Sequence, residues 1–280
     1  MKNIFVVGAG TMGLDIAQVF STAGYEVSVY DMTDDIIAKS AARLEKGLSK
    51  RVEKGKLTEE MKNKIVGGIS FTTQYDNAAN ADLIIEAIIE SVEVKKNVFR
   101  NLDGLCPEKT IFATNTSSIS ITEIASATKR PEKFIGMHFF NPATVMKLVE
   151  VIRGMHTSDE TFRAVYELSE AIGKTPVEVA EAPGFVVNRI LIPMINEAIG
   201  LVAEGVASPE DIDTAMKLGA NHPMGPLALG DLVGLDVVLA IMDTLYKETG
   251  DGKYRAHPLL RKMVRGKLLG RKSGKGFYEY

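Results

Sequence analysis

Short apolar, β-branched runs alternate with amphipathic helical segments over the first two thirds of the chain. The runs cover residues 4–7, 26–30, 83–86, 110–114, 133–137 and 147–152, and the helical segments cover residues 11–23, 34–54, 92–105 and 159–172. Parallel strands need a crossover between them, so this alternation predicts a mostly parallel sheet with helices on both faces. The central runs are almost entirely apolar, as expected of strands covered on both sides.

Two departures from this alternation define the rest of the fold. Residues 34–54 and 58–66 both have helical patterns, so a helical hairpin is inserted before the β-like run at Ile69. After Glu181-Ala182-Pro183-Gly184 the strand signal stops, and residues 185–205, 209–218, 229–249 and 258–264 are predicted to be helices. We therefore expect a doubly wound α/β domain over residues 1–183 and a smaller all-α domain over residues 184–280.

Composition excludes several classes of protein. The formal net charge of −3 gives no basic field for nucleic-acid binding. No apolar run approaches the roughly 20 residues of a membrane span, and the N-terminus lacks a secretory pattern, so we expect a cytoplasmic protein without a membrane partner. Cys106 is the one cysteine, which leaves no internal disulfide and no Cys/His cluster for a metal.

A glycine-rich turn joins the first strand to the first helix. In Gly8-Ala9-Gly10-Thr11-Met12-Gly13, the first glycine permits a tight turn, the second lets the backbone approach a pyrophosphate, and the third allows close packing of helix on strand. Asp31 ends the second strand, where a carboxylate can accept hydrogen bonds from ribose hydroxyls and repel a 2′-phosphate. This favours NAD over NADP; a surface aspartate beside a structural glycine turn is the alternative.

His138 and Glu150 form the strongest catalytic candidate. His138 ends one strand, Phe139-Phe140-Asn141-Pro142 turns the chain, and Glu150 lies in the next strand. If the two strands fold back on each other, these side chains become neighbours across the ladder. An imidazole can accept the proton that leaves an alcohol during hydride transfer, and a carboxylate on its other nitrogen stabilises the imidazolium. Alternatively, Glu150 is only a polar strand residue.

Three further groups of polar residues are weaker candidates. Asn115-Thr116-Ser117-Ser118 follows a strand and could hold a substrate or the nicotinamide ribose, or be a simple turn. Glu90 and Lys95 could contact the cofactor, or be solvated charges. Arg43, Lys46, Lys50 and Lys54 share one predicted helix face, which could hold phosphates or be an ordinary solvated surface.

The motifs together resemble the 3-hydroxyacyl-CoA dehydrogenase family, particularly its bacterial 3-hydroxybutyryl-CoA dehydrogenases. The stretches that carry the resemblance span the chain: GAGTMG, EAIIE, NTSSISIT, GMHFFNPATVMKLVEV, PGFVVNRI, EDIDTAMKLGANHPMGPL and SGKGFYEY. The resemblance implies a Rossmann-type first domain, and a reaction that interconverts a short 3-hydroxyacyl-CoA and its 3-ketoacyl-CoA with NAD. A longer or dicarboxylic acyl chain, a sugar acid, or a non-catalytic role like that of lens crystallins are the alternatives.

The resemblance also implies residue roles. His138 would be the general base, Glu150 its partner, Asn188 the amide near the reacting oxygen, Ser117 a substrate-binding hydroxyl, and Asn141 a support of the same pocket. Cofactor contacts are expected at Gly8, Gly10, Thr11, Met12, Gly13, Asp31, Glu90, Lys95 and Asn115, and coenzyme A contacts at Lys50 and Lys54.

The sequence also predicts a homodimer. Apolar side chains in the C-terminal helices exceed what a small domain is expected to cover, and the family resembled commonly forms dimers. These side chains are Leu229, Leu232, Val233, Leu235, Val237, Val238 and Ile241. Of the other histidines, we expect His222 to be structural and His156 and His257 to lie at the surface.

Overall fold

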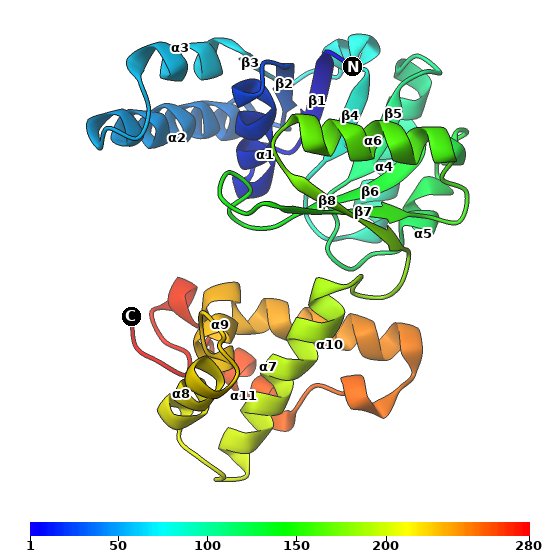
Figure 1. The fold of residues 1–280 in the computed structure, drawn as a ribbon. Coiled ribbons are helices and arrows are strands. Elements are labelled where there is room, and N and C mark those ends of the chain that lie inside the picture. The colour runs from blue at the N-terminus through cyan, green and yellow to red at the C-terminus, as the bar shows by residue number, and fades with distance from the viewer. The chain divides into compact units, whose positions relative to one another are not determined.

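The computed structural model describes all 280 residues and divides into two compact units, Met1–Ala182 and Pro183–Tyr280 (Figure 1). The first unit contains one eight-stranded sheet. Its strands are β1 Asn3–Val7, β2 Glu26–Tyr30, β3 Ile69–Thr72, β4 Leu83–Glu86, β5 Ile111–Thr114, β6 Phe134–Phe139, β7 Leu148–Arg153 and β8 Thr175–Ala180. The predicted fold class, a doubly wound sheet with an inserted helical hairpin and a following helical domain, is confirmed.

The strand order is β3-β2-β1-β4-β5-β6-β7-β8, and every neighbouring pair is parallel except β6 and β7. The chain moves outward from β1 in one direction to β3, then returns to β4 on the other side of β1. The connections that leave the carboxyl ends of β1 and β4 therefore run in opposite directions, which makes this a topological switch point, where doubly wound sheets bind ligands. The carboxyl ends of β5 and β6 lie at the same edge, because both strands continue the parallel arrangement.

Helices cover both faces of this sheet. They are α1 Thr11–Thr22, α2 Asp34–Glu53, α3 Glu59–Gly67, α4 Val92–Leu105, α5 Ile121–Ala125 and α6 Asp159–Ala171. The expected hairpin is α2 and α3, which lie side by side at the β3 end of the sheet (Figure 1). Thr33 and Thr58 cap these two helices through their side chains, and acidic residues follow in each first turn, as the helix dipole favours.

The alternation of side chains along β6 decides which face carries the candidate histidine. Ile135, Met137 and Phe139 belong to the main apolar core, together with residues of α1 and α6. Successive strand residues point to opposite faces, so His138 lies on the other face, with Phe134. Phe134 packs there against Phe99 of α4, at a ring-centroid distance of 4.6 Å.

The second unit is entirely helical. Its helices are α7 Val187–Ala203, α8 Pro209–Gly219, α9 Pro226–Val233, α10 Leu235–Thr249 and α11 Pro258–Arg265. The expectation of one helix over residues 229–249 is wrong: Gly234 separates α9 from α10. Its φ of 100° is a conformation that side-chain-bearing residues rarely adopt. No helix in the structure is long and apolar enough to cross a membrane.

The break at Gly234 also changes what happens to the apolar side chains of this segment. Leu235, Val238 and Ile241, which the sequence analysis counted in the apolar excess, are buried in the core of their own unit. Leu232 and Val237 remain 48% and 39% exposed. The apolar surface left uncovered is thus smaller than the sequence indicated, because α7 and α11 also pack on α10.

Two buried aspartates hold the C-terminal segment. Asp231 accepts hydrogen bonds from the amides of Phe277 and Tyr278, and Asp213 accepts one from the Tyr278 hydroxyl at 2.8 Å. The SGKGFYEY stretch is therefore part of the packing of this unit. His257 also has a structural contact: it caps α11, where its Nδ1 accepts from the amide of Leu259.

Candidate active site

The glycine-rich turn connects β1 to α1 with almost no spare room. A Cβ atom on Gly13 would lie 1.8 Å from the Gly8 carbonyl oxygen, and one on Gly8 would lie 2.6 Å from the Ala87 oxygen. Gly10, in contrast, has no neighbouring atom within 4 Å of such a Cβ position, and no side chain caps the α1 N-terminus. An uncapped helix N-terminus beside open space suits an anion such as a pyrophosphate.

Asp31 and Arg43 fix this turn from two sides. One oxygen of Asp31 accepts from the Ala9 amide at 2.8 Å, and the other accepts from the Met32 amide at 2.7 Å. Arg43 donates to the Gly10 carbonyl oxygen at 2.9 Å and to the Thr11 hydroxyl at 3.2 Å. The sequence interpretation grouped Arg43 with the lysines of its helix face, whereas its guanidinium faces the glycine-rich turn.

His138 and Glu150 are brought together as predicted. They are direct partners in the antiparallel β6–β7 ladder, and Nδ1 of His138 lies 2.8 Å from a carboxylate oxygen of Glu150. Both side chains are buried, with 7% and 1% of their surface exposed. A carboxylate beside Nδ1 stabilises the tautomer that carries its proton there, which leaves Nε2 as the basic nitrogen. The alternative that Glu150 is an unpaired polar strand residue is wrong.

The turn after β5 is linked to both β4 and β6. The side-chain oxygen of Asn115 accepts from the Phe139 amide at 2.8 Å, which holds the end of β6 next to His138. Glu90, in the loop after β4, accepts from the Thr116 hydroxyl at 2.5 Å and the Ser117 amide at 2.9 Å. Asn115, Ser117 and Glu90 thus belong to one connected group at the carboxyl edge of the sheet.

Lys95 is a buried member of this group. Its ammonium lies 2.6 Å from Glu86 and 3.2 Å from Glu90, and its side chain is only 1% exposed. The alternative that Lys95 is a solvated charge is therefore wrong. Burial tends to raise the pKa of Glu90, but Lys95 and the hydrogen bonds from Thr116 and Ser117 outweigh it and hold that pKa below its ordinary value.

Sequence reasoning missed Glu86 because it ends an apolar strand. It is fully buried, and it accepts from Lys95, the Ile88 amide at 2.7 Å and the Thr114 hydroxyl at 2.6 Å. These three donors satisfy the buried carboxylate, which would otherwise be costly to remove from water. The one available signal was that an acidic residue in such a strand needs a cation, and Lys95 follows nine positions later.

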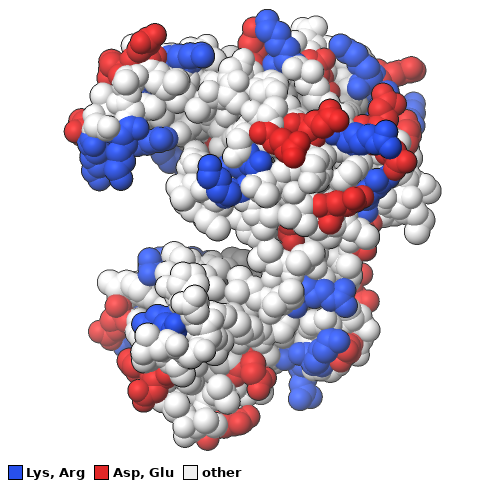
Figure 2. All heavy atoms as spheres, viewed as in Figure 1, with Lys and Arg blue, Asp and Glu red and all other residues white.

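The remaining candidates lie on or just after α2, in the β6–β7 loop and in the second unit. Lys46 and Lys50 are exposed on α2, and Lys54 is exposed at its C-terminal end, where Lys and Arg side chains gather (Figure 2). Asn141 is exposed in the loop between β6 and β7. Asn188 belongs to the second unit, in the first turn of α7.

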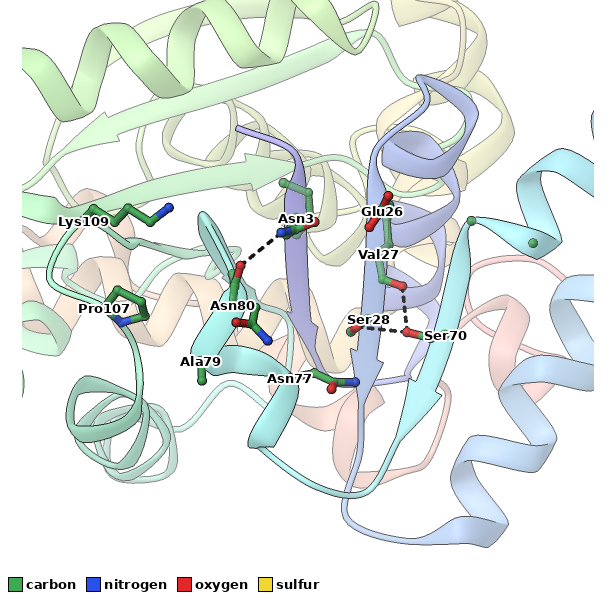
Figure 3. A pocket seen from close by; sticks show the side chains of 14 residues that line it. Asn3, Glu26, Val27, Ser28, Ser70, Asn77, Ala79, Asn80, Pro107 and Lys109 are labelled. Carbon is green, nitrogen blue, oxygen red and sulfur yellow. Dashed lines mark hydrogen bonds between the residues drawn. The ribbon is translucent and has the colours of Figure 1, made fainter.

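A groove lies at the opposite edge of the sheet. It has a volume of about 850 Å³ and is lined by residues at the amino ends of β1, β2 and β3 (Figure 3). Several of its polar groups are paired with each other: Asn3 donates to the Asn80 carbonyl oxygen, and the hydroxyls of Ser28 and Ser70 lie 2.9 Å apart. Lys109 pairs with Asp82. The groove is therefore not the candidate active site.

Neither metal nor thiol chemistry is indicated by the side chains. No group of three or more His, Cys, Asp or Glu residues is placed to hold a metal ion. Burial raises the pKa of the Cys106 thiol to about 11, and its sulfur donates to the Ala78 carbonyl oxygen. This thiol is protonated at neutral pH and lacks the reactivity of a catalytic cysteine.

Comparison with known protein families decides the assignment. Residues 3–182 match the NAD-binding domain of 3-hydroxyacyl-CoA dehydrogenase, and residues 184–280 match the C-terminal domain of the same family. The chain belongs to the 3-hydroxyacyl-CoA dehydrogenase family. The glycine-rich turn and Asp31 accordingly lie in the family's NAD-binding domain.

Individual members of the 3-hydroxyacyl-CoA dehydrogenase family are similar over the whole chain. A 3-hydroxybutyryl-CoA dehydrogenase of Clostridioides difficile is 62% identical over 278 residues, which is 99% of each chain. A probable 3-hydroxybutyryl-CoA dehydrogenase of Bacillus subtilis is 54% identical, covering 100% of this chain and 98% of the relative. The crystal structure of (S)-3-hydroxybutyryl-CoA dehydrogenase from Ralstonia eutropha superposes with a TM-score of 0.96 at 50% identity, covering 100% and 99% of the two chains.

Proposed function

We propose that this protein interconverts (S)-3-hydroxybutyryl-CoA and acetoacetyl-CoA with NAD as the cofactor. The observation that carries the proposal is the buried His138–Glu150 pair at the carboxyl edge of the sheet. Family membership and the full-length similarity to 3-hydroxybutyryl-CoA dehydrogenases support the substrate class and the short acyl chain.

His138 is the general base of the proposed oxidation. Nε2 of its imidazole accepts the proton of the substrate 3-hydroxyl as the hydride leaves C3. Glu150, at Nδ1, stabilises the imidazolium that forms, because its negative charge is already buried beside the ring. In the reduction, the imidazolium returns the proton to the developing alkoxide. Bound NAD supplies the hydride acceptor for oxidation and NADH the donor for reduction.

The residues of the glycine-rich turn fit a dinucleotide. The uncapped N-terminus of α1 would hold the pyrophosphate, and Asp31 would accept hydrogen bonds from the ribose hydroxyls while its charge repels a 2′-phosphate. NAD is therefore preferred over NADP in this proposal. Glu90 and Asn115 would border the nicotinamide end, since they follow β4 and β5, and Lys95 of α4 would act there through its ion pair with Glu90.

The remaining residues bind the acyl-CoA. Ser117 and Asn188 hydrogen-bond the reacting oxygen, and Asn141 supports the same pocket. The exposed Lys50 and Lys54 attract the phosphates of coenzyme A as point charges. For Asn188, Asn141 and the lysines, the support is the family's motif at their positions.

The proposal also includes the oligomeric state of the protein and its cellular compartment. We expect a homodimer in the cytoplasm, with the partly exposed Leu232 and Val237 of the second unit as candidates for its interface. The free, buried Cys106 is compatible with a reducing compartment.

An assay of the purified protein with acetoacetyl-CoA and NADH, followed at the nicotinamide absorbance, tests the proposed reaction. We expect rapid oxidation of NADH, slower oxidation of NADPH, and collapse of turnover in His138→Ala with little change in NADH affinity. Near-wild-type turnover in this variant would refute the role of His138. Absence of turnover in the wild-type protein would refute the reaction itself.

A further inference from the structure

Asp15 joins the helix of the dinucleotide turn to the loop that follows His138. It lies in the second turn of α1, four residues after Thr11, and its carboxylate accepts from the Ala143 amide at 3.1 Å. Ala143 is fully buried within the loop that connects β6 to β7. Asp15 is thus a direct polar contact between the dinucleotide-binding helix and the hairpin that carries His138 and Glu150.

Lys174 holds the same loop from the other side. Its ammonium donates to the carbonyl oxygens of Ala143 and Met146. The peptide groups around Ala143 therefore have a carboxylate on the amide side and an ammonium on the carbonyl side. Such charge-assisted bonds are stronger than neutral ones, so they restrict the loop to one position.

The electrostatics of Asp15 link it further to the glycine-rich turn. Burial raises the pKa of Asp15, and the amides of Ala143 and Thr144 and the charges of Arg43 and Lys174 only partly oppose this. The folded protein thus keeps a carboxylate where burial disfavours its ionised form. Buried polar groups that cost stability are common where position is needed for function.

We propose that Asp15 is a positioning residue that couples dinucleotide binding at the α1 N-terminus to acyl-CoA binding at the β6–β7 loop. This inference rests on the proposed function. The dinucleotide orders α1 and the glycine-rich turn, and Asp15 transmits this order to the loop that carries Asn141. Coupling between two ligands is reciprocal, so each ligand tightens the binding of the other by the same factor.

The abortive pair NAD and acetoacetyl-CoA gives a direct test, because two oxidised ligands cannot react. Calorimetry yields the Kd of acetoacetyl-CoA with and without saturating NAD, and the ratio of the two values is the coupling factor. In the wild type, we expect acetoacetyl-CoA to bind the NAD complex more tightly than the free protein. In Asp15→Ala the ratio should fall about tenfold towards one, the effect of losing a hydrogen bond to a charged group. The Kd of NAD alone should change little.

Three further variants separate positioning from stability. Asp15→Asn keeps an acceptor for the Ala143 amide, so its coupling ratio should lie between that of the wild type and that of Asp15→Ala. Its Tm at neutral pH should not fall. Lys174→Met removes the bonds to the carbonyl oxygens of Ala143 and Met146 in the same loop, should also lower the ratio, and replaces Asp15→Ala if that variant does not fold. Asp82→Asn is the control: Asp82 also accepts two backbone amides, from Lys2 and Asn3, but at the amino edge of the sheet. Its ratio should equal that of the wild type.

The outcomes distinguish the inference from the proposed function. An active wild type whose coupling factor is unchanged in Asp15→Ala, or is already one, overturns the role of Asp15 alone. A wild type that neither binds nor reduces acetoacetyl-CoA overturns the proposed function and the role of Asp15 with it. A similar fall of the coupling factor in Asp82→Asn would also overturn the role of Asp15, because it would show that any carboxylate bound to backbone amides affects coupling.

Discussion

Replacement of Glu150 by Gln removes one charge from the proposed catalytic pair and leaves its shape almost unchanged. The Gln side-chain oxygen can still accept from Nδ1 of His138, so the tautomer and the position of the ring can be retained. What is lost is the negative charge 2.8 Å from the imidazole, at a site where both side chains are buried. The variant therefore isolates the electrostatic part of the proposed mechanism.

The size of the effect follows from Coulomb's law. A 2.8 Å contact between the nitrogen and the oxygen places the two centres of charge about 4 Å apart. At an effective dielectric constant of about 20, the imidazolium–carboxylate attraction is about 4 kcal/mol. Each 1.36 kcal/mol corresponds to about a tenfold change in rate, so loss of this attraction in the transition state predicts a fall in kcat of about 10³-fold.

Steady-state kinetics of acetoacetyl-CoA reduction and of the reverse oxidation measure this fall. Because the carboxylate acts on the imidazolium and not on the bound substrate, kcat should fall while KM changes little. Glu178→Gln is the matched control: Glu178 lies in the neighbouring strand β8 and forms an exposed ion pair with Arg153. The reasoning would be refuted by a Glu150→Gln enzyme whose kcat is within a few-fold of the wild-type value, or by a Glu178→Gln enzyme with the same fall in kcat.

Three further predictions concern cofactor choice, coenzyme A binding and acid stability. Asp31→Ser combined with Met32→Arg should shift the ratio of kcat/KM for NADH and NADPH towards NADPH; a wild type that already prefers NADPH would contradict the role of Asp31. Lys50→Gln with Lys54→Gln should raise KM for acetoacetyl-CoA several-fold, with a loss that shrinks at high salt, and should leave a substrate without the nucleotide phosphates unaffected. Glu90→Gln should lower Tm at neutral pH. The pKa of Glu90 in the folded protein lies below its ordinary value of 4.5. The difference in Tm between the variant and the wild type should therefore shrink below pH 4.5 and disappear once the pH is below the folded-state pKa. A difference in Tm that stays constant with pH would contradict the ionised network.

The sequence predicted the part of the site that depends on strand pairing. The histidine at the end of one strand and the glutamate in the next were recognised because a hairpin makes residues 138 and 150 neighbours, and the ladder pairs them directly. The glycine-rich turn was equally accessible, since its spacing is imposed by steric contacts such as that of Gly13 with the Gly8 oxygen. Both predictions used geometry that is set by residues close to each other in the sequence.

The contacts missed by sequence analysis are those that join distant segments. Arg43 and Asp15 reach the glycine-rich turn and the β6–β7 loop through the packing of α2 and α1, and nothing in the local pattern fixes those directions. Strand β8 was also not predicted: it lies at the sheet edge, and its short run contains Pro176 and the exposed Glu178. Such an edge strand lacks the continuous apolar pattern of the central strands.

The antiparallel pairing of β6 with β7 makes enzymatic activity a reporter of refolding. His138 and Glu150 lie opposite each other only in one register, and a shift of one residue would turn one of them to the face occupied by Ile135 and Met137. If His138 and Glu150 are the catalytic pair, as proposed, a chain that has regained its helices and its compactness but pairs these strands wrongly would be inactive. Return of turnover after dilution from denaturant therefore marks the moment at which this hairpin is correctly aligned, whereas far-ultraviolet circular dichroism does not.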